Sequence, residues 1–440
     1  MPAALPDTIF ALSSGHGRAG IAVVRLSGPL AGQCLAELTG SVPPLRQAAL
    51  RKLKATDRSV IDEAMVLYFA APHSVTGEDV AELHVHGAPA VVEALLAELG
   101  AKPGLRIAEA GEFTRRAFAN DKMDLVEVEG LADLLGATTE VQRKLAMRQF
   151  LGDASTVYET WRNSVISALS LFEASIDFSD EDDVAAKAQA AAWPKIRGLV
   201  SELENALAQA DQFGAIRSGL RVVIAGAPNV GKSSLLNALA GREAAIVSPI
   251  AGTTRDIVES HLQVAGLPLI LADTAGLREV ASDVIEDEGM ARAKAASDSA
   301  DILIWVTAAD VSEKVGPPRS PDLIVQNKVD LIPIRNRNES GIAVSTLTGV
   351  GLVELRDALR KLVERRVAGA EHAVVVRQRH VLAVKESIRL LNNCLTQQKR
   401  DAELTAEDLR RAARALSSVT GHVDVEDLLG NIFNEFCIGK

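Results

Sequence analysis

One stretch, Gly226–Ser233 with the sequence G-A-P-N-V-G-K-S, limits what this chain can fold into more than any other. The apolar run Arg221–Ala225 before it predicts a buried strand, and the pattern Ser234–Leu239 after it predicts a helix. This order predicts a phosphate-binding loop, because the glycines let backbone N–H groups point at phosphate oxygens and the helix offers its positive N-terminal end. We expect Lys232 to reach the outer phosphates and the Ser233 hydroxyl to ligate magnesium.

Four further apolar runs predict strands, and two of them lead directly into polar signatures. The runs are Leu267–Ala272, Ile302–Thr307, Leu323–Gln326 and Ile342–Val344. After the first comes Asp273-Thr274-Ala275-Gly276, where the aspartate can hold magnesium through water and the glycine lets the backbone approach the terminal phosphate. After the third comes Asn327-Lys328-Val329-Asp330. The Asp330 carboxylate can only accept hydrogen bonds, so it suits guanine, whose N1–H and 2-amino group both donate.

Two other stretches complete the pattern. Ser345-Thr346-Leu347 follows the last strand, where a loop would close over the guanine. Gly252–Asp256 lies between the first two signatures, where a switch segment would supply a second magnesium hydroxyl, from Thr254. Residues 217–365 therefore resemble a translation-factor-class GTPase domain with all five of its signatures. The expected nucleotide contacts are Gly226, Asn229, Val230, Gly231, Lys232, Ser233, Ser234, Ser248, Thr253, Thr254, Asp273, Thr274, Ala275, Gly276, Asn327, Lys328, Asp330, Ser345, Thr346 and Leu347.

The size and composition of the chain set further bounds. A length of 440 residues implies about three domains. The net charge of −11 argues against a protein that coats nucleic acid non-specifically, because such affinity comes from neutralising phosphates. The three cysteines, Cys34, Cys394 and Cys437, are too far apart to suggest a zinc site or a disulfide framework. No apolar run could span a bilayer and no signal peptide is visible, so we expect a cytoplasmic protein without a membrane partner.

The first 120 residues predict a mixture of strands and helices. Strands are expected at Ile21–Leu26, Glu63–Phe69 and Asp79–Val85, and helices at Leu30–Leu38 and Pro89–Leu99. Gly15–Gly20 matches the dinucleotide fingerprint G-x-G-x-x-G, but that fingerprint must open a helix and here a strand follows, so we interpret it as a glycine loop.

Charged side chains in this first part suggest a binding site. Arg25, Glu82 and Lys122 lie in apolar or turn-forming settings and together could bind a polar heteroaromatic acid, with ordinary surface charge as the alternative. His84 and His86 point to one face of a strand. Without a third ligand at suggestive spacing, we interpret them as hydrogen-bonded histidines or as the wall of a pocket.

The remaining segments predict helices on both sides of the GTPase region. They are Leu125–Leu135, Val141–Leu151, Val157–Phe172, Ala185–Ala210, Val381–Leu395 and Ala406–Leu416. The simplest architecture is a discontinuous helical domain with an inserted GTPase, because domain termini usually lie close together at the surface. The fold class is therefore multidomain α/β plus all-α. The predicted domains are an N-terminal α+β domain (1–121), a helical domain in two parts (122–214 and 370–440) and a Ras-like P-loop GTPase domain (215–369).

A resemblance to a known family rests on several motifs together. These are Thr76-Gly77-Glu78-Asp79, Gly111-Glu112-Phe113-Thr114, Asn229 in the phosphate loop, Gly252-Thr253-Thr254-Arg255-Asp256 and the terminal Cys437-Ile438-Gly439-Lys440. With them the whole chain closely resembles the tRNA-modification GTPase family MnmE, also called TrmE.

The resemblance implies a biochemical role. It implies a homodimer through N-terminal domains that bind 5-formyl- or 5,10-methylene-tetrahydrofolate, and a heterotetramer with the flavoprotein MnmG. Together they would install carboxymethylaminomethyl or aminomethyl groups at C5 of the wobble uridine of certain tRNAs. Arg25, Glu82, Lys122 and Lys440 match the folate-contacting residues of the family, and Cys437 matches its tail cysteine, whose chemical role stays open.

The resemblance also indicates how GTP would be hydrolysed. Leu277 follows the D-x-x-G signature, where many small GTPases carry a glutamine that orients water, and leucine cannot do so. In the family a glutamate acts through water, and Glu286 is the best match. Asn229 matches the potassium ligand of the family, helped by Ser248, Ile250 and Thr253. Arg255 in the switch segment is a further candidate catalytic residue.

Two functions remain open from the sequence. One is a potassium-dependent GTPase in tRNA modification, and the other is a GTP-dependent assembly factor that binds ribosomal RNA. A basic face for tRNA, or an ordinary solvated helix surface, could be formed by Arg377, Arg379, Lys385, Arg389, Lys399, Arg400, Arg410, Arg411 and Arg414.

Overall fold

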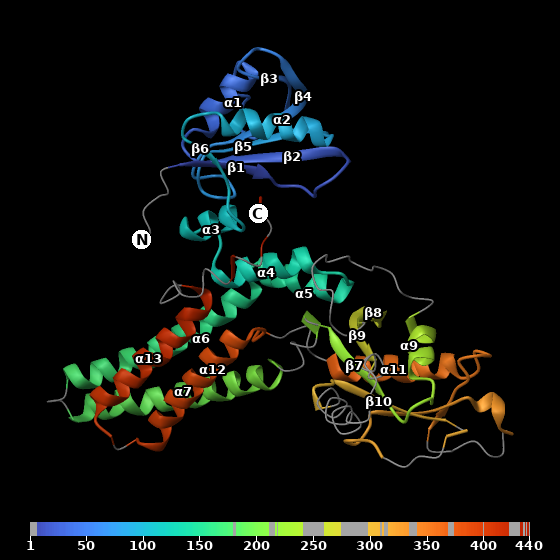
Figure 1. Cartoon of the computed structure of the whole chain (residues 1–440). Coiled ribbons are helices and arrows are strands. Elements are labelled where there is room, and N and C mark those ends of the chain that lie inside the picture. The colour runs from blue at the N-terminus through green and yellow to red at the C-terminus, as the bar shows by residue number, and fades with distance from the viewer. Residues whose placement is uncertain are drawn as a thin grey trace, which may run out of the picture. The chain divides into compact units, whose positions relative to one another are not determined.

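A computed structural model describes residues 7–178, 182–210, 216–217, 219–240, 259–273, 298–308, 310–311, 316–333, 341–367, 374–398, 400–421, 432–433, 436 and 438–439 (Figure 1). Within this part the chain forms two compact units. One comprises residues 1–132, 148–163 and 413–440, and the other comprises residues 133–147 and 164–412.

A six-stranded sheet forms the centre of the N-terminal part. Its strands, in spatial order, are β3 (Ala49–Lys54), β4 (Val60–Phe69), β5 (Val80–Gly87), β2 (Ala19–Ser27), β1 (Thr8–Leu12) and β6 (Leu105–Ile107). Helices α1 (Ala31–Thr39) and α2 (Pro89–Gly100) cover one face of this sheet, where they bury Val24 and Leu83 (Figure 1). Because side chains alternate along a strand, Arg25 and Glu82 belong to the opposite face.

The sequence predicted part of this sheet correctly. The expected strands correspond to β2, β4 and β5, and the expected helices to α1 and α2. The glycine stretch Gly15–Gly20 runs into β2 and opens no helix, as predicted. Strands β1, β3 and β6 were missed. Residues 8–11 of β1 are all buried and show no alternation, β3 is an edge strand rich in cations, and β6 has only three residues.

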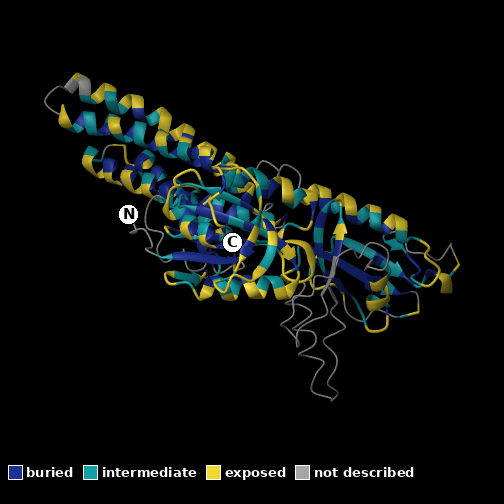
Figure 2. Ribbon diagram, turned by 90° about the horizontal axis from the view of Figure 1, so that it is seen from above, coloured by how far each residue is buried: buried dark blue, intermediate teal, exposed yellow. Residues whose placement is uncertain are grey.

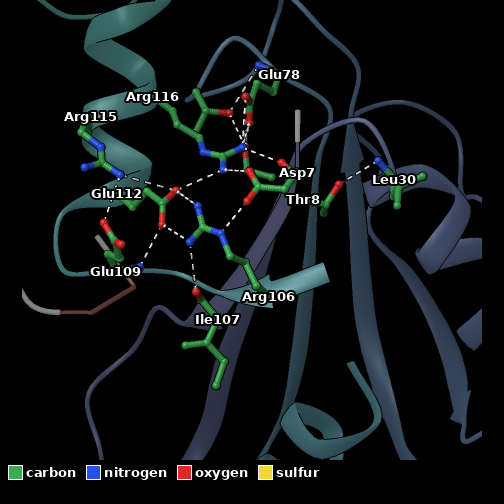
Figure 3. A network of polar contacts seen from close by, with 12 residues as sticks. Asp7, Thr8, Leu30, Glu78, Arg106, Ile107, Glu109, Glu112, Arg115 and Arg116 are labelled. Carbon is green, nitrogen blue, oxygen red and sulfur yellow. Dashed lines mark hydrogen bonds and ion pairs between the residues drawn. The ribbon is translucent and has the colours of Figure 1, made fainter. Parts of the chain in front are cut away.

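A cluster of ionic side chains braces the N-terminal part (Figure 3). Arg116 in α3 (Glu112–Ala119) is 2 % exposed, and its guanidinium contacts three carboxylates. The Arg116 nitrogens lie 2.8 Å from Asp7 Oδ1, 3.1 Å from Glu78 Oε2 and 3.1 Å from Glu112 Oε1. Arg106 of β6 donates to Glu112 and Asp7 as well. The T-G-E-D and G-E-F-T stretches thus meet in one network, although they are far apart in the sequence.

The network holds its carboxylates ionised. Burial disfavours the charged forms of Asp7 and Glu112, but hydrogen bonds from Arg106 and Arg116 outweigh it, so both pKa values lie below their ordinary range. A lowered pKa in the folded state stabilises the fold above the ordinary pKa of about 4, and this contribution is lost as the pH falls through the lowered value.

Helices form most of the remaining chain outside the GTPase segment. They are α4 (Leu125–Gly136), α5 (Glu140–Phe150), α6 (Asp153–Asp177), α7 (Asp182–Ala208), α12 (Gln378–Thr396) and α13 (Ala402–Thr420). In the second unit α6, α7, α12 and α13 pack as a bundle. Phe172 of α6 meets Trp193 of α7, and the Ser387 hydroxyl of α12 donates to the Ala412 carbonyl of α13. All six helices were predicted from the sequence.

The GTPase segment contains a second six-stranded sheet. In spatial order its strands are β12 (Ile342–Ala343), β11 (Leu323–Asn327), β10 (Ile302–Ala308), β7 (Leu220–Ala225), β9 (Leu267–Asp273) and β8 (Glu259–Val264). Every pairing is parallel except that of β8 with β9. Helices α9 (Lys232–Ala240) and α11 (Leu352–Val367) share a core with its strands, whose buried residues are dark blue in Figure 2.

The predicted fold class is confirmed. The chain has an N-terminal α+β part, and helices precede and follow a segment that contains a P-loop nucleotide-binding sheet. The predicted strands correspond to β7, β9, β10, β11 and β12. Strand β8 was missed because its sequence, E-S-H-L-Q-V, is half polar. The domain limits 1–121, 122–214, 215–369 and 370–440 stay predictions. None of the described helices is long and apolar enough to cross a membrane.

The ionic cluster gives a testable prediction. Replacing Arg116 with Met leaves Glu78, Glu112 and Asp7 without their shared cation, so local stability should fall by about 3–5 kcal/mol. Arg115, in the same helix, is 39 % exposed in its side chain, and Arg115→Met is the matched control with an expected cost of about 0–1 kcal/mol. Pulse proteolysis of the full chain in urea, scored at the β1–β2 connection, measures both. Equal susceptibility of the two variants would contradict the bracing role.

Candidate nucleotide-binding and N-terminal sites

The phosphate loop leaves β7 at Ala225 and turns into α9 at Lys232. Gly226 has φ 153°, and a Cβ there would lie 2.1 Å from the Val306 carbonyl oxygen of β10. Gly231 has φ 91°, and a Cβ there would lie 2.3 Å from Asn327 Nδ2. Neither position can carry a side chain without moving a neighbouring strand or the guanine signature, so both glycines of the motif are required by packing.

Lys232 and Asn229 show how the phosphate loop is arranged. The Lys232 ammonium group donates to the carbonyl oxygens of Gly226, at 3.1 Å, and Ala227, at 3.0 Å, so it lies folded over the loop. Asn229 has φ 64°, a left-handed conformation that asparagine tolerates better than most residues. Asn229, Ser233 and Ser234 are exposed. The loop therefore presents side chains of the types that a nucleotide and its cations require.

Asn327 joins the guanine signature to the phosphate loop. Its Nδ2 donates to the Val230 carbonyl oxygen at 2.9 Å, its Oδ1 accepts the Thr346 N–H at 3.4 Å, and the residue is 1 % exposed. One buried amide thus fixes the predicted phosphate, base and lid stretches relative to one another.

The other base-reading residues lie around Asn327. Asp330 is exposed in the short 3₁₀ helix Val329–Leu331. The Lys328 ammonium lies 2.8 Å from Asp310 Oδ2, and this hydrogen bond lowers the pKa of the Asp310 carboxyl. Ser345 is buried, whereas Leu347 is 85 % exposed. The base signature therefore offers the Asp330 carboxylate to solvent on a backbone fixed by Asn327.

These signatures share one edge of the sheet. They follow the carboxyl ends of β7, β9 and β11, and Asp273 is the last residue of β9, paired with Ile224 of β7. The strand order reverses at β7, the first strand of the segment, and crevices for ligands in parallel sheets open at such points. Ser248, Ile250, Thr253, Thr254, Arg255, Thr274, Ala275, Gly276, Glu286, Cys437 and Lys440 lie outside the described residues.

On the N-terminal sheet, Arg25 and Glu82 are brought together. They are register partners on β2 and β5, and Glu82 Oε1 accepts from Arg25 Nη2 at 2.8 Å and from Nε at 3.0 Å. His84 Nε2 lies 3.3 Å from Glu82 Oε2. Burial disfavours the Glu82 carboxylate, but Arg25 and His84 outweigh it and lower its pKa. Glu82 is therefore an oriented, ionised acceptor.

The other predicted members of this site are placed more loosely. Lys122 lies beside the T-G-E-D stretch, because a Cβ on Gly77 would be 3.2 Å from Lys122 Cε. The terminal tail also reaches this sheet: Ile438 bridges to Ala110, and a Cβ on Gly439 would lie 2.0 Å from the Leu12 carbonyl oxygen. The residue before Lys440 therefore lies at the end of β1, the strand next to Arg25.

The sequence did not indicate Phe113, and it left two interpretations of the two histidines open. The Phe113 ring lies 5.8 Å from the Arg25 guanidinium carbon and supports it from one side. The only signal was its place in the G-E-F-T stretch. His86 Nδ1 lies 2.8 Å from Asp62 Oδ1 and His84 contacts Glu82, so both are hydrogen-bonded, in agreement with one of these interpretations. No cluster of three or more metal-binding side chains occurs among the described residues.

Five of the nine basic residues that could form a face for tRNA are paired with carboxylates. Each of five arginines lies within 4.0 Å of a carboxylate: Arg377 (Asp133), Arg389 (Glu386), Arg400 (Asp408), Arg410 (Glu173 and Glu407) and Arg411 (Glu386 and Asp408). Lys399 is outside the described residues. Both interpretations, a basic face for tRNA and an ordinary solvated helix surface, therefore stay predictions.

The sheet topology, the phosphate loop and the guanine signature together define a P-loop GTPase. This class of protein accounts only for the GTPase segment. Comparison with known proteins identifies the remaining parts of the chain. Residues 8–122 match the family model for the N-terminus of the GTP-binding protein TrmE, and residues 125–437 match the model for the MnmE helical domain. The chain belongs to the MnmE (TrmE) family.

Individual relatives match over their full length. The tRNA modification GTPase MnmE of Rhizobium johnstonii is 48 % identical over 442 residues, covering 100 % of both chains. The protein of the same name from Brucella canis is 45 % identical, covering 99 % of this chain and 98 % of the relative. Among solved structures, the G domain of the T. maritima FeoB iron transporter is 22 % identical, covers 32 % of this chain and 98 % of that chain, and has a TM-score of 0.22, too low to support an argument.

The position of Asp330 predicts the base specificity. Asp330→Asn replaces an acceptor with an amide that can also donate, so GTP should bind about 10- to 200-fold more weakly and xanthosine triphosphate, with a 2-oxo group, more tightly. Competition binding with the two nucleotides measures the exchange of preference. Asp357→Asn, which changes an exposed carboxylate of α11 away from the signature, is the control. An unchanged preference for guanine would remove Asp330 from the base site.

Proposed function

We propose that this chain is a potassium-dependent GTP hydrolase that acts with a flavoprotein partner on tRNA. In this proposal it installs (carboxymethyl)aminomethyl groups at C5 of the wobble uridine and uses a tetrahydrofolate one-carbon unit. The observation that carries the proposal is the full-length identity of 48 % to a protein named tRNA modification GTPase, which includes the N-terminal and helical parts and not only the GTPase segment. We infer a cytoplasmic homodimer that forms a heterotetramer with MnmG.

The GTPase part of the proposal assigns roles to individual residues. Backbone N–H groups of the phosphate loop and Lys232 would bind the phosphates, and Ser233 with Thr254 would hold magnesium. Asp330 would read the guanine, with its backbone fixed through the bond of Asn327 to Val230. Asp273 ends β9 beside the loop, where the D-x-x-G signature would meet the terminal phosphate. Glu286 would orient the attacking water.

The N-terminal part of the proposal assigns folate to the face that carries Arg25 and Glu82. The Glu82 side chain suits this ligand. The pterin ring carries the same adjacent N–H and amino donors as guanine, and Glu82 is an ionised acceptor. Lys122 and Lys440 would bind the carboxylate tail of the cofactor. Bound folate would supply a one-carbon unit, whereas the residues of this chain bind and orient it. The role of Cys437 stays open.

The competing proposal is an assembly factor that binds ribosomal RNA and performs no chemistry beyond hydrolysis. A folate site in the N-terminal domain would separate the two, because an assembly factor has no need of one.

Cells that carry a variant of Arg25 decide between these functions. Arg25→Met should remove the cation that orients Glu82, abolish binding of 5-formyl-tetrahydrofolate in calorimetry and lower wobble-uridine modification by at least about tenfold, while GTP hydrolysis continues. Arg51→Met, a cation of the edge strand β3, is the matched control and should keep all three activities. Nucleoside analysis of tRNA measures the modification. Normal modified uridine in cells that lack the protein would favour the assembly factor.

Potassium dependence rests on Asn229. Phosphoryl transfer is accelerated by positive charge near the β- and γ-phosphates, and an exposed asparagine carbonyl in the phosphate loop can hold a cation there. Ser248, Ile250 and Thr253 would complete the shell. The alternative is that Asn229 only braces the loop in its left-handed conformation, which Asn229→Gly would preserve.

Rates in different cations test the role of Asn229. Hydrolysis by the wild type should be about 10- to 1000-fold faster in potassium than in sodium at equal ionic strength, and both Asn229→Ala and Asn229→Gly should lose this stimulation. Rubidium and caesium extend the series by ionic size. Equal rates in potassium and sodium, or stimulation that survives in Asn229→Gly, would refute a potassium ligand at this position.

A further inference from the structure

The GTPase segment joins the helical part through two connections, and one carboxylate holds both. The incoming connection passes Arg217 just before β7, and the outgoing connection passes Arg377 just before α12. Asp133 of α4 accepts from Arg217 Nε at 3.0 Å and from Arg377 Nη2 at 2.9 Å, both on its Oδ1. These three residues come from segments that are far apart in the sequence.

Hydrogen bonds and apolar packing support the same corner. The Gln142 amide of α5 donates to the carbonyl oxygens of Ile216, at 3.2 Å, and Arg217, at 3.1 Å. Ile216, Val376 and Leu145 are 1 %, 5 % and 6 % exposed, and they belong to the core that is built around the GTPase sheet. The incoming connection, the outgoing connection and α5 are therefore packed as one piece.

Helix α5 also touches the GTPase sheet at a second place. The turn of the β8–β9 hairpin is Ala265-Gly266, with φ 53° and 76°, and a Cβ on Gly266 would lie 3.4 Å from Val141 Cγ2. In the sequence, β8 follows the predicted switch stretch Gly252–Asp256, and β9 ends at Asp273 of D-x-x-G. The hairpin thus connects the two stretches that sense the terminal phosphate in GTPases of this class.

Burial makes the ionic part of this corner sensitive to change. The side chains of Asp133 and Arg377 are 17 % and 9 % exposed, so removing one charge of this pair is costly for the other. Arg217 is more exposed, at 38 %. A neutral side chain in place of Asp133 would leave Arg377 without this carboxylate and would release the incoming connection from the outgoing one.

We propose that Asp133 and Gln142 are positioning residues of the GTPase cycle. They hold the GTPase segment on α4 and α5, so that displacement of the β8–β9 hairpin between nucleotide states is transmitted to α5 and the helical bundle. The inference rests on the proposed GTPase function and adds the route by which the nucleotide state reaches the rest of the chain. The hydrogen bonds given above join neither residue to the phosphate loop or the guanine signature, so we expect replacing them to change GTP binding little.

The experiment compares Asp133→Asn with a chemically matched control. Asp322 is 15 % exposed in its side chain, lies 2.8 Å from Arg366 and 3.3 Å from Arg319, and accepts the Leu303 N–H at 2.9 Å. Asp322→Asn therefore removes the same charge from a carboxylate that also pairs with two arginines. Its partners Arg319, Arg366 and Leu303 all lie within the GTPase segment. Hydrogen–deuterium exchange of α5 and α12 is measured in the full-length protein with GDP and with a non-hydrolysable GTP analogue. Affinities for both nucleotides are measured in parallel.

The wild type and Asp322→Asn should show a difference in α5 exchange between the two nucleotides. Asp133→Asn should reduce this difference by about fivefold or more, with GTP affinity changed by less than about twofold. Asp133→Glu, which restores the charge, should recover part of the difference. If Asp133→Asn fails to fold, Gln142→Met is the second variant. It removes the two hydrogen bonds donated by the amide and those that its Oε1 accepts from Thr138 and Thr139, without affecting a buried charge, and it should show the same loss.

Three results of this experiment would contradict the proposal. The proposal is overturned if Asp133→Asn or a folded Gln142→Met keeps the full nucleotide-dependent difference, if Asp322→Asn loses it as well, or if the wild type shows none while binding both nucleotides. A wild-type protein that binds no GTP at all would instead overturn the proposed function.

Discussion

The hydrogen bond from Asn327 to the Val230 carbonyl oxygen is the interaction on which the nucleotide site depends. It forms where Gly231 leaves no room for a side chain, so the phosphate loop and the guanine signature approach more closely than ordinary residues would allow. A buried amide that is satisfied on both sides tolerates little displacement, because each lost bond leaves a desolvated polar group. The loop and the base reader therefore keep a fixed spacing, as recognition of a whole nucleotide requires.

The N-terminal sheet uses charge for the same purpose. Arg116 and Arg106 gather Asp7, Glu78 and Glu112, and the cluster holds the T-G-E-D stretch against α3. Gly77 of that stretch lies beside Lys122, and Phe113 of α3 lies under Arg25. The motif residues of this part thus divide into two groups. The ionic cluster positions the backbone, and the smaller group of Arg25, Glu82 and Lys122 is the one that we propose to bind a ligand.

The candidate nucleotide site and the candidate N-terminal site lie in different parts of the chain. Members of the MnmE family contain both parts in one chain. In our proposal the GTPase segment passes its nucleotide state to the helical bundle. The corner formed by α4 and α5 is suited to this, because it holds both connections of the inserted segment and contacts the hairpin between the predicted switches. Several arginines of α12 and α13 form ion pairs with neighbouring acids, and whether this surface contacts tRNA stays a prediction.

The sequence by itself determined the GTPase fold, most of the helices and the order of the nucleotide signatures, because these depend on local patterns: apolar runs, glycine spacing and helical periodicity. It also marked Arg25, Glu82 and Lys122 as candidates, but only the tertiary structure decided that Arg25 and Glu82 meet across β2 and β5 and that the tail reaches β1. Edge and short strands such as β3 and β6 were invisible because their stability comes from pairing and not from their own residues. The roles of Asp133, Phe113 and Arg116 were invisible for a related reason. An isolated charged or aromatic residue acquires its function from partners distant in the sequence, and local chemistry does not specify which partners the fold will bring to it.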